Sequence, residues 1–177
     1  MAAEIILINP PPLNWREKHD ALNHPHLGLA YLSAYLRQNN FECQPIDAKF
    51  ERMNLEELGK AIKKYRPILV GITAMTHEIG QAAQVARLVK ELFPEVKTVL
   101  GGAHATALPQ ETLRQFPEFD MAIVGEGEIT LLELVKTLIQ RGELSKIAGL
   151  AFRPSSDAII LNNCRQPIQN CHPTAIQ

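Results

Sequence analysis

The sequence predicts an α/β fold of the flavodoxin-like (Rossmann-like) type, with a five-stranded parallel sheet of order 2-1-3-4-5 and helices on both faces. Short apolar runs alternate with helical patterns five times along the chain. Such alternation is typical of a parallel sheet joined by right-handed crossovers. The length of 177 residues suits one domain with a hydrophobic core. We expect a C-terminal β-hairpin at the far edge of this sheet.

Five strands are expected, at 4–9, 41–47, 68–73, 97–102 and 121–128, the last running into a loop. The first is a β-branched run that stops at three prolines, which is typical of a buried strand ending in a loop. In the second strand, Pro45 favours an edge position because proline cannot donate to a sheet ladder. The third is apolar on both faces and suits the middle of a parallel sheet.

Five helices are expected, at 27–40, 55–65, 78–93, 109–116 and 129–142. The first repeats apolar residues at helical spacing and closes on two asparagines. Asn54 can cap the second helix, in which acidic residues come first and basic residues last. The third helix ends before Pro94, the fourth has a proline in its first turn, and Gly142 stops the fifth.

The end of the chain is predicted to be a hairpin followed by a tail. The segments 148–154 and 158–163 are read as two strands joined by Ser155, Ser156 and Asp157. We therefore divide the chain into a main domain at 1–147, a hairpin extension of the same domain at 148–163, and a linker or tail at 164–177. The segment from 13 to 25 is polar and irregular.

Composition excludes several classes of partner. The formal net charge is −1, with no basic block, so neither nucleic acid nor an anionic membrane surface is expected. The apolar runs are too short to span a membrane, and the first twelve residues do not resemble a signal peptide. Cys43, Cys164 and Cys171 lack the spacing of a zinc or iron–sulfur site and suggest free thiols in a reducing cytoplasm.

The residues that break the strand and helix patterns follow the carboxyl ends of the five strands. They are Asn9 to Pro11, Asp47, Thr73 to His77, Gly101 to Thr106, and Gly125 to Glu128. Ligands of open α/β sheets bind at this edge, so the five loops should surround one groove. Its glycines, small residues and hydroxyls favour a broad or elongated ligand lying against backbone. Neither GxGxxG nor GxxxxGK[ST] is present.

Each of these signals has a structural alternative that the residues leave open. The glycine pair could form a tight turn, His104 could be a surface or structural histidine, and Met75 could belong to the core. The hydroxyls of Thr73 and Thr76 could cap local backbone. The carboxylates of Glu126 and Glu128 in the last loop could simply keep that loop hydrated, or interact favourably with the N-terminus of the next helix.

Five segments in order resemble the N-terminal cobalamin-binding domain of B12-dependent radical SAM enzymes. They are ILINPP, HPHLGLAYLSAYLR, GITAMT, VLGGAHATALPQE and IVGEGEITLLELV, within residues 4–153. The resemblance implies that Thr73, Met75, Gly101 and Gly102 line the slot for the nucleotide tail of cobalamin. It also implies that the other loops touch the corrin or its amides. The candidate cofactor-binding residues are Asn9, Pro10, Asp47, Thr73, Met75, Thr76, Gly101, Gly102, His104, Thr106, Gly125, Glu126 and Gly127, with no catalytic residue and no metal ligand assigned.

The sequence departs from related patterns in two places. Methionine-synthase-like domains carry a cobalt-ligating histidine after the second strand, where this chain has Lys49, and a protonated ammonium is no ligand. The resemblance therefore implies base-off, His-off cobalamin; whether His77 or His104 could replace that histidine stays open. The CxxxCxxC loop of radical SAM proteins is absent, since Cys164 and Cys171 are seven positions apart, so no iron–sulfur cluster is expected in this chain.

The leading functional hypothesis is a cobalamin-binding module of a methyltransferase- or cyclase-type radical SAM enzyme, whose radical SAM domain is missing from this chain or lies on a separate protein. The sequence offers no nucleophile–base pair that would indicate catalysis by the module alone. Alternatives are a cobalamin carrier or sensor that acts with a partner, a flavodoxin-like protein that binds FMN or another cofactor, and a fold that survives only as an interaction surface. The prolines after the first strand disfavour FMN, because they cannot donate N–H groups to a phosphate.

Overall fold

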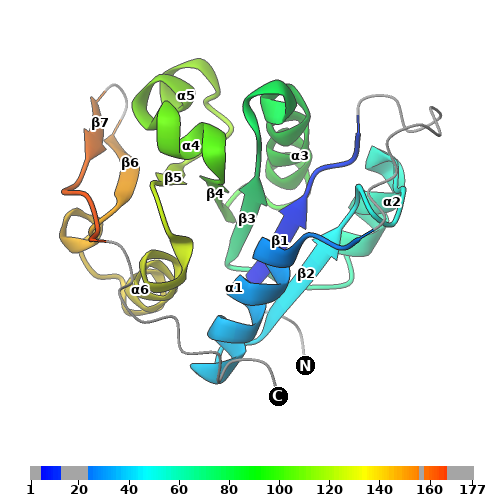
Figure 1. The fold of residues 1–177 in the computed structure, drawn as a ribbon, viewed down its shortest axis with the longest axis horizontal. Coiled ribbons are helices and arrows are strands. Elements are labelled where there is room, and N and C mark those ends of the chain that lie inside the picture. The colour runs from blue at the N-terminus through cyan, green and yellow to red at the C-terminus, as the bar shows by residue number, and fades with distance from the viewer. Residues whose placement is uncertain (1–4, 13–23, 156–157, 167–177) are drawn as a thin grey trace.

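The computed structural model describes residues 5–12, 24–155 and 158–166. Its centre is one sheet with the strand order β2-β1-β3-β4-β5-β6-β7 (Figure 1). The strands are β1 (Ile5–Asn9), β2 (Cys43–Asp47), β3 (Leu69–Thr73), β4 (Lys97–Gly101), β5 (Met121–Ile123), β6 (Leu150–Ser155) and β7 (Ala158–Leu161). The first five pair in parallel. The predicted order 2-1-3-4-5 is therefore confirmed.

The hairpin is also confirmed at the far edge of the sheet. Strand β6 pairs antiparallel with β5, and β7 pairs antiparallel with β6, which makes one sheet of seven strands. At the opposite edge, Pro45 lies in β2, as its missing N–H predicted. The predicted irregular segment at 13–23, the turn at 156–157, and the tail at 167–177 with Cys171 lie outside the described residues.

Six α-helices cover the described part of the sheet: α1 (Leu27–Gln38), α2 (Leu55–Ile62), α3 (Ile79–Leu92), α4 (Ala103–Ala107), α5 (Pro109–Gln115) and α6 (Gly127–Gln140). Short 3₁₀ turns lie at Thr76–Glu78 and Leu144–Lys146. Asn54 caps α2 in a reciprocal capping box with Glu57, as expected. Asn39 ends α1, and Asn40 follows it with a positive φ of 66°.

Helix α4 corrects the sequence analysis, which treats 103–106 as loop. Gly102 turns the chain sharply with φ 91°, and five small or polar residues then complete one helical turn. Its backbone bonds run from Thr106 N–H to the Gly102 carbonyl and from Leu108 N–H to the His104 carbonyl. The error has a physical reason: a single turn is too short to produce an apolar repeat of helical period.

Two apolar layers separate the helices by face. Ile6 and Ile8 of β1 point to the layer formed with α2, α3 and α5, whereas Ile5 and Leu7 point to the layer formed with α1 and α6. This alternation follows from the two-residue period of a strand. Both layers are buried, so the sheet is covered on both faces as a central parallel sheet requires. None of the described helices is long and apolar enough to cross a membrane.

Candidate functional site

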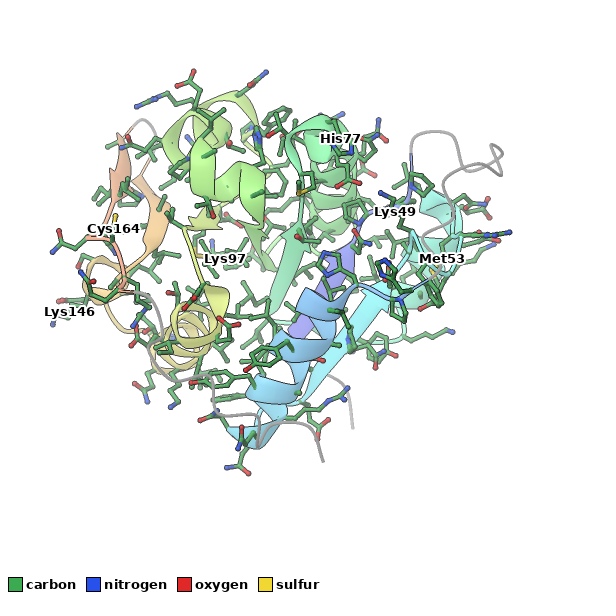
Figure 2. All side chains as sticks on the ribbon, viewed as in Figure 1. Lys49, Met53, His77, Lys97, Lys146 and Cys164 are labelled. Carbon is green, nitrogen blue, oxygen red and sulfur yellow. The ribbon has the colours of Figure 1, made fainter. Side chains whose placement is uncertain are left out.

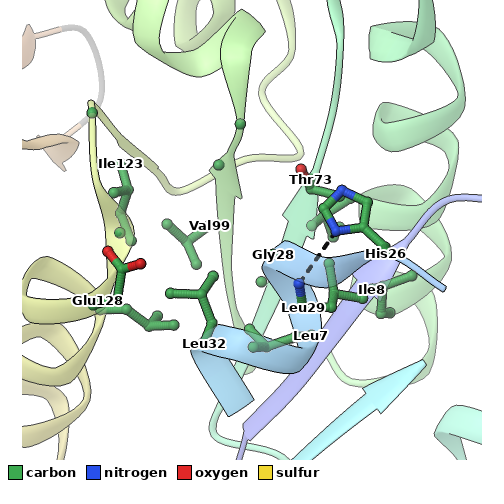
Figure 3. A pocket seen from close by; sticks show the side chains of 17 residues that line it. Leu7, Ile8, His26, Gly28, Leu29, Leu32, Thr73, Val99, Ile123 and Glu128 are labelled. Carbon is green, nitrogen blue, oxygen red and sulfur yellow. Dashed lines mark hydrogen bonds between the residues drawn. The ribbon is translucent and has the colours of Figure 1, made fainter. Parts of the chain in front are cut away.

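A cavity of about 240 Å³ lies between the sheet and the helices α1 and α6, at the carboxyl ends of β1, β3, β4 and β5 (Figure 3). Its walls are mostly apolar, with Leu7 and Val99 from the sheet, Leu29 and Leu32 from α1, and Leu131 from α6. At about 30 Å³ for each water molecule in the liquid, it has room for a planar organic group rather than a single solvent molecule.

The cavity exists because β4 presents a glycine to this face. Gly71 of β3 pairs with Val99 of β4, and Thr73 pairs with Gly101 two residues further on. A Cβ added at Gly101 would meet no atom within 4 Å, so the space in front of Gly101 is open. A Cβ at Gly71 would instead lie 2.7 Å from Leu7 Cδ2, so Gly71 lets the Leu7 side chain pack against β3, and the missing side chain at Gly101 leaves the cavity.

Gly102 has a different function in the local structure. Its φ of 91° and ψ of −171° fall in a region that only glycine adopts readily. A Cβ at Gly102 would lie 2.7 Å from Thr73 Oγ1 and 2.9 Å from the Ala74 carbonyl oxygen. Gly102 therefore allows the β4 loop to lie directly against the β3 loop at the mouth of the cavity.

The structure brings five of the predicted site residues together in the cavity lining. They are Thr73, Gly101, Gly102, Gly125 and Gly127. Gly125 has a φ of 79°, and a Cβ there would also meet open space. The glycine-rich loops after β4 and β5 thus lie on one cavity, as their position at the carboxyl ends of neighbouring strands predicted.

Other predicted residues form the framework around the cavity. Asp47 accepts three hydrogen bonds, from Asn9 Nδ2 at 2.7 Å, from the His26 backbone N–H at 2.7 Å and from the Phe50 N–H at 3.1 Å. Its carboxylate therefore fixes the ends of β1 and β2 against the start of α1. Pro10 is buried directly after β1.

The remaining predicted residues lie near the mouth but outside the cavity lining. His104 is buried, and its Nδ1 lies 3.3 Å from Thr76 Oγ1. Burial lowers the pKa of His104 below the usual value for histidine. Thr106 Oγ1 donates to the Gly102 carbonyl and accepts from Gly125 N–H, which joins two loops. Met75 is 52% exposed, and Glu126 is also exposed.

Sequence analysis missed several lining residues. His26 caps α1, because its Nδ1 accepts from Leu29 N–H at 3.2 Å, and its ring faces the cavity in Figure 3. Glu128 lines the wall, whereas the predicted Glu126 does not. The glycine inside the strand run LVGIT, Gly71, was a readable signal, because an interior glycine often marks a close approach to the sheet.

Lys49 occupies the position at which related domains carry a histidine, and it forms an ion pair with Glu78. The distance between Lys49 Nζ and Glu78 Oε1 is 2.5 Å. Glu78 also accepts a hydrogen bond from the Met75 N–H at 3.2 Å. Burial opposes ionisation of Glu78, but the bonds from Lys49 and Met75 outweigh it and lower the pKa of the carboxyl. The ammonium is therefore engaged with a carboxylate.

The described cysteines lie apart from the cavity. Cys43 is buried in β2, and burial raises the pKa of its thiol to about 12. Cys164 is exposed beside the hairpin, on the opposite side of the view from Lys49 and His77 (Figure 2). Among the residues that the structure describes, no group of three His, Cys, Asp or Glu side chains could hold a metal ion.

Residues 19–135 match the family model of the B12 binding domain, which covers more than half of the chain. The chain belongs to the B12-binding domain family. The match includes α1 with its His26 cap, the Asp47 loop, both loops that meet at Gly102 and the first turns of α6. All residues that line the cavity, except Leu7 and Ile8 of β1, lie within the matched region.

Two curated relatives extend the comparison. The chain is 37% identical over 150 residues to an uncharacterized methyltransferase, PH0819, of Pyrococcus horikoshii, covering 85% of this chain and 32% of the relative. It is 29% identical over 153 residues to the anaerobic magnesium-protoporphyrin IX monomethyl ester cyclase of Rubrivivax gelatinosus, covering 84% of this chain and 27% of the relative. The B12-binding domain thus spans about a third of the length of these relatives.

Solved structures show the same fold. The radical S-adenosylmethionine methyltransferase TsrM from Kitasatospora setae, with cobalamin and a [4Fe-4S] cluster bound, matches with a TM-score of 0.76 and 19% identity, over 97% of this chain and 30% of TsrM. The cobalamin-dependent radical enzyme OxsB, with aqua-cobalamin and S-adenosylmethionine bound, matches with a TM-score of 0.78 and 16% identity, over 93% of this chain and 23% of OxsB.

Proposed function

We propose that this B12-binding domain holds cobalamin in the base-off, His-off form, as the cofactor module of a radical SAM enzyme of the methyltransferase or cyclase type. The observation that carries the proposal is the cavity in front of Gly101, where a glycine of β4 leaves open space at the carboxyl edge of a B12-binding fold. The nucleotide tail of the cofactor would enter this space with its planar base between the sheet and the helices α1 and α6.

The lining suits such a tail. The apolar side chains of Leu7, Leu32 and Val99 offer contact surface for an aromatic base. Polar groups lie closer to the mouth, with the Thr73 side chain and the imidazole of His26. Because His26 Nδ1 accepts from Leu29 N–H, a neutral ring carries its proton on Nε2, which can donate to an acceptor at the mouth.

The rim of the cavity would support the corrin ring and its amides. The residues proposed for this role are Asn9, Pro10, Asp47, Met75, Thr76, His104, Thr106, Gly125, Glu126 and Gly127, with Thr73, Gly101 and Gly102 at the tail slot. Exposed apolar side chains at this edge, Leu27, Phe50 and Met75, would shield the lower face of the ring from water. These groups bind, orient and exclude water.

No protein nitrogen is proposed as a lower ligand of cobalt. Lys49 stands where that ligand would come from, and its ammonium is paired with Glu78. His104 is buried with its ring nitrogen on the Thr76 hydroxyl, and His77 is a solvent-exposed residue of the 3₁₀ turn. The cofactor, when bound, supplies methyl-transfer or radical chemistry at cobalt, and the domain supplies its position.

The activity of the whole protein would require a radical SAM domain, on the same polypeptide or on a separate one. The relatives are about three times as long as this domain, and their names describe methyltransferases and cyclases. A reducing, cytoplasmic setting is proposed with this assignment, because Cys43 and Cys164 are free thiols. The domain boundaries at 147 and 163 stay proposals as well.

The test is a titration of the domain with hydroxocobalamin, followed in the visible spectrum, with FMN as the competing cofactor. We expect saturable uptake of cobalamin with a base-off spectrum and no uptake of FMN. Uptake of FMN without cobalamin would favour a flavodoxin-like protein, and uptake of neither would remove the proposal.

Two glycine substitutions locate the site. Gly101→Leu places its Cβ where no atom lies within 4 Å and its side chain in the cavity, so we expect an intact fold and at least a tenfold loss of cobalamin affinity. Gly80→Leu is the matched control, because a Cβ at Gly80 also meets open space but lies at the exposed start of α3. Equal affinity of both variants would contradict the tail slot.

A further inference from the structure

One residue of the cavity lining has a buried side-chain oxygen without a partner. Glu128 is the second residue of α6 and lines the cavity, with its carboxyl group beside Ile123 in Figure 3. Its Oε2 atom is buried and has no hydrogen-bond partner among the described residues. The lining also includes Gly125 and the apolar side chains of Ile123 and Leu131.

A buried carboxyl oxygen without a donor destabilises the ligand-free fold, because it has lost its hydration and gained nothing in exchange. Native proteins hold few such groups, and each calls for an explanation. The other such oxygen among the described residues, Glu118 Oε2, belongs to a carboxylate that already pairs with Arg87, whereas Glu128 lines the cavity. Location at the start of α6 favours the negative charge but does not explain why this oxygen is buried in the cavity wall. Glu126, two residues earlier, is exposed at the same helix end.

We propose that Glu128 Oε2 accepts a hydrogen bond from a donor on the nucleotide tail of the bound corrinoid. This inference rests on the proposed function. A carboxylate accepts from hydroxyl or N–H groups and repels a phosphate, so it would select the sugar or the base of the tail. The ribose offers a hydroxyl donor in every cobamide, and an adenine base offers an amino donor that dimethylbenzimidazole lacks.

The consequence is a residue that lowers stability and raises affinity. Glu128→Leu removes the unpaired acceptor and keeps an apolar side chain of moderate size, so the ligand-free variant should melt at or above the wild-type temperature. The same variant should bind cobalamin at least tenfold more weakly. Glu128→Gln keeps a carbonyl acceptor and should retain most of the affinity. A residue that only supports the fold would instead lose stability and affinity together.

The experiment measures the melting temperature without ligand and the affinities for three probes: cobalamin, a cobamide with adenine as its lower base, and cobinamide, which has no nucleotide tail. Glu91→Leu is the control, because Glu91 is exposed on α3, on the other face of the sheet. We expect Glu128→Leu to weaken both complete corrinoids and to leave cobinamide binding unchanged. Equal losses for the two complete corrinoids indicate the ribose hydroxyl, and a larger loss for the adenine form indicates the base.

Three results would overturn the inference. Wild-type affinity of Glu128→Leu for both complete corrinoids would show that the oxygen makes no bond to the tail. An equal loss of cobinamide affinity in Glu128→Leu would show that the substitution acts on binding of the corrin ring or on the fold. Failure of the wild-type domain to bind any of the three probes would remove the proposed function itself, and the inference with it.

Discussion

Lys49 Nζ lies 2.5 Å from Glu78 Oε1, and this ion pair joins the loop after β2 to the turn before α3. Both side chains are largely buried, at 22% and 17% exposure. The ion pair therefore engages the Lys49 ammonium with a carboxylate. The position that supplies a histidine in methionine-synthase-like domains here supplies a structural contact.

Lys49→Met is expected to lower the free energy of unfolding at pH 7 by more than the ~1 kcal/mol typical of exposed pairs, because it leaves a largely buried carboxylate without its cation. The pKa of Glu78 is lowered in the folded state, so its contribution is present above the unfolded value near 4.5 and is lost as pH falls through the folded pKa. Urea unfolding should therefore separate the variant from the wild type at pH 7 and bring them together near pH 3. The same separation at both pH values would contradict the ion-pair interpretation.

The burial of His104 predicts a second dependence of folding stability on pH. Burial lowers its pKa from 6.5 in the folded state, so the unfolded chain takes up a proton first as pH falls. Stability should then decline between pH 7.5 and pH 5.5, and His104→Gln should flatten that decline in urea midpoints. His24→Gln is the control, because His24 is exposed. If both variants keep the wild-type slope of stability against pH, burial of His104 does not cause the decline.

Asp47 is expected to be structurally important as well as close to the cofactor. Asp47→Ala removes the acceptor for Asn9 Nδ2 and for the His26 and Phe50 N–H groups. Hydrogen bonds to a charged group are each worth about 1.5–3 kcal/mol, so we expect a loss of at least about 2 kcal/mol in chemical denaturation. Glu51→Ala, at an exposed position of the same loop, should cost little. A neutral effect of Asp47→Ala would rule out this role.

The two adjacent glycines should respond differently to alanine. Gly102→Ala forces a Cβ against Thr73 Oγ1 at a φ of 91°, and such backbone strain costs about 1–3 kcal/mol. Gly101→Ala places its Cβ in open space and should leave stability nearly unchanged. Thermal unfolding of the two variants checks this. Equal stabilities would mean that the β4 loop can move away from the β3 loop at little cost.

The sequence predicted the sheet well because strand and helix periods are local signals. Apolar runs located β1, β3 and β4, and Pro45 placed β2 at an edge. The short helix α4 escaped because one turn has no period to detect. The loop at Gly125 and Glu126 was predicted, but α6 begins at Gly127, two residues before the expected start at 129.

The site was predicted in part. Glycines after strand ends are recognisable, and Gly101, Gly102, Gly125 and Gly127 do line the cavity. The walls were not recognisable, because Leu29, Leu32 and Leu131 have the same pattern as ordinary core residues on α1 and α6. Whether such a leucine faces a cavity or a neighbour depends on a side chain missing from another element, here at Gly101.

The central claim is that the tail of cobalamin leaves cobalt and occupies the cavity while no protein nitrogen replaces it. Electron paramagnetic resonance of the bound cofactor, reduced to the cobalt(II) state, tests this directly, since a nitrogen on the lower face splits each cobalt line into three. We predict unsplit cobalt lines in the wild type and in the His77→Gln and His104→Gln variants. A threefold splitting in the wild type would contradict the account, and its loss in one histidine variant would identify the ligand.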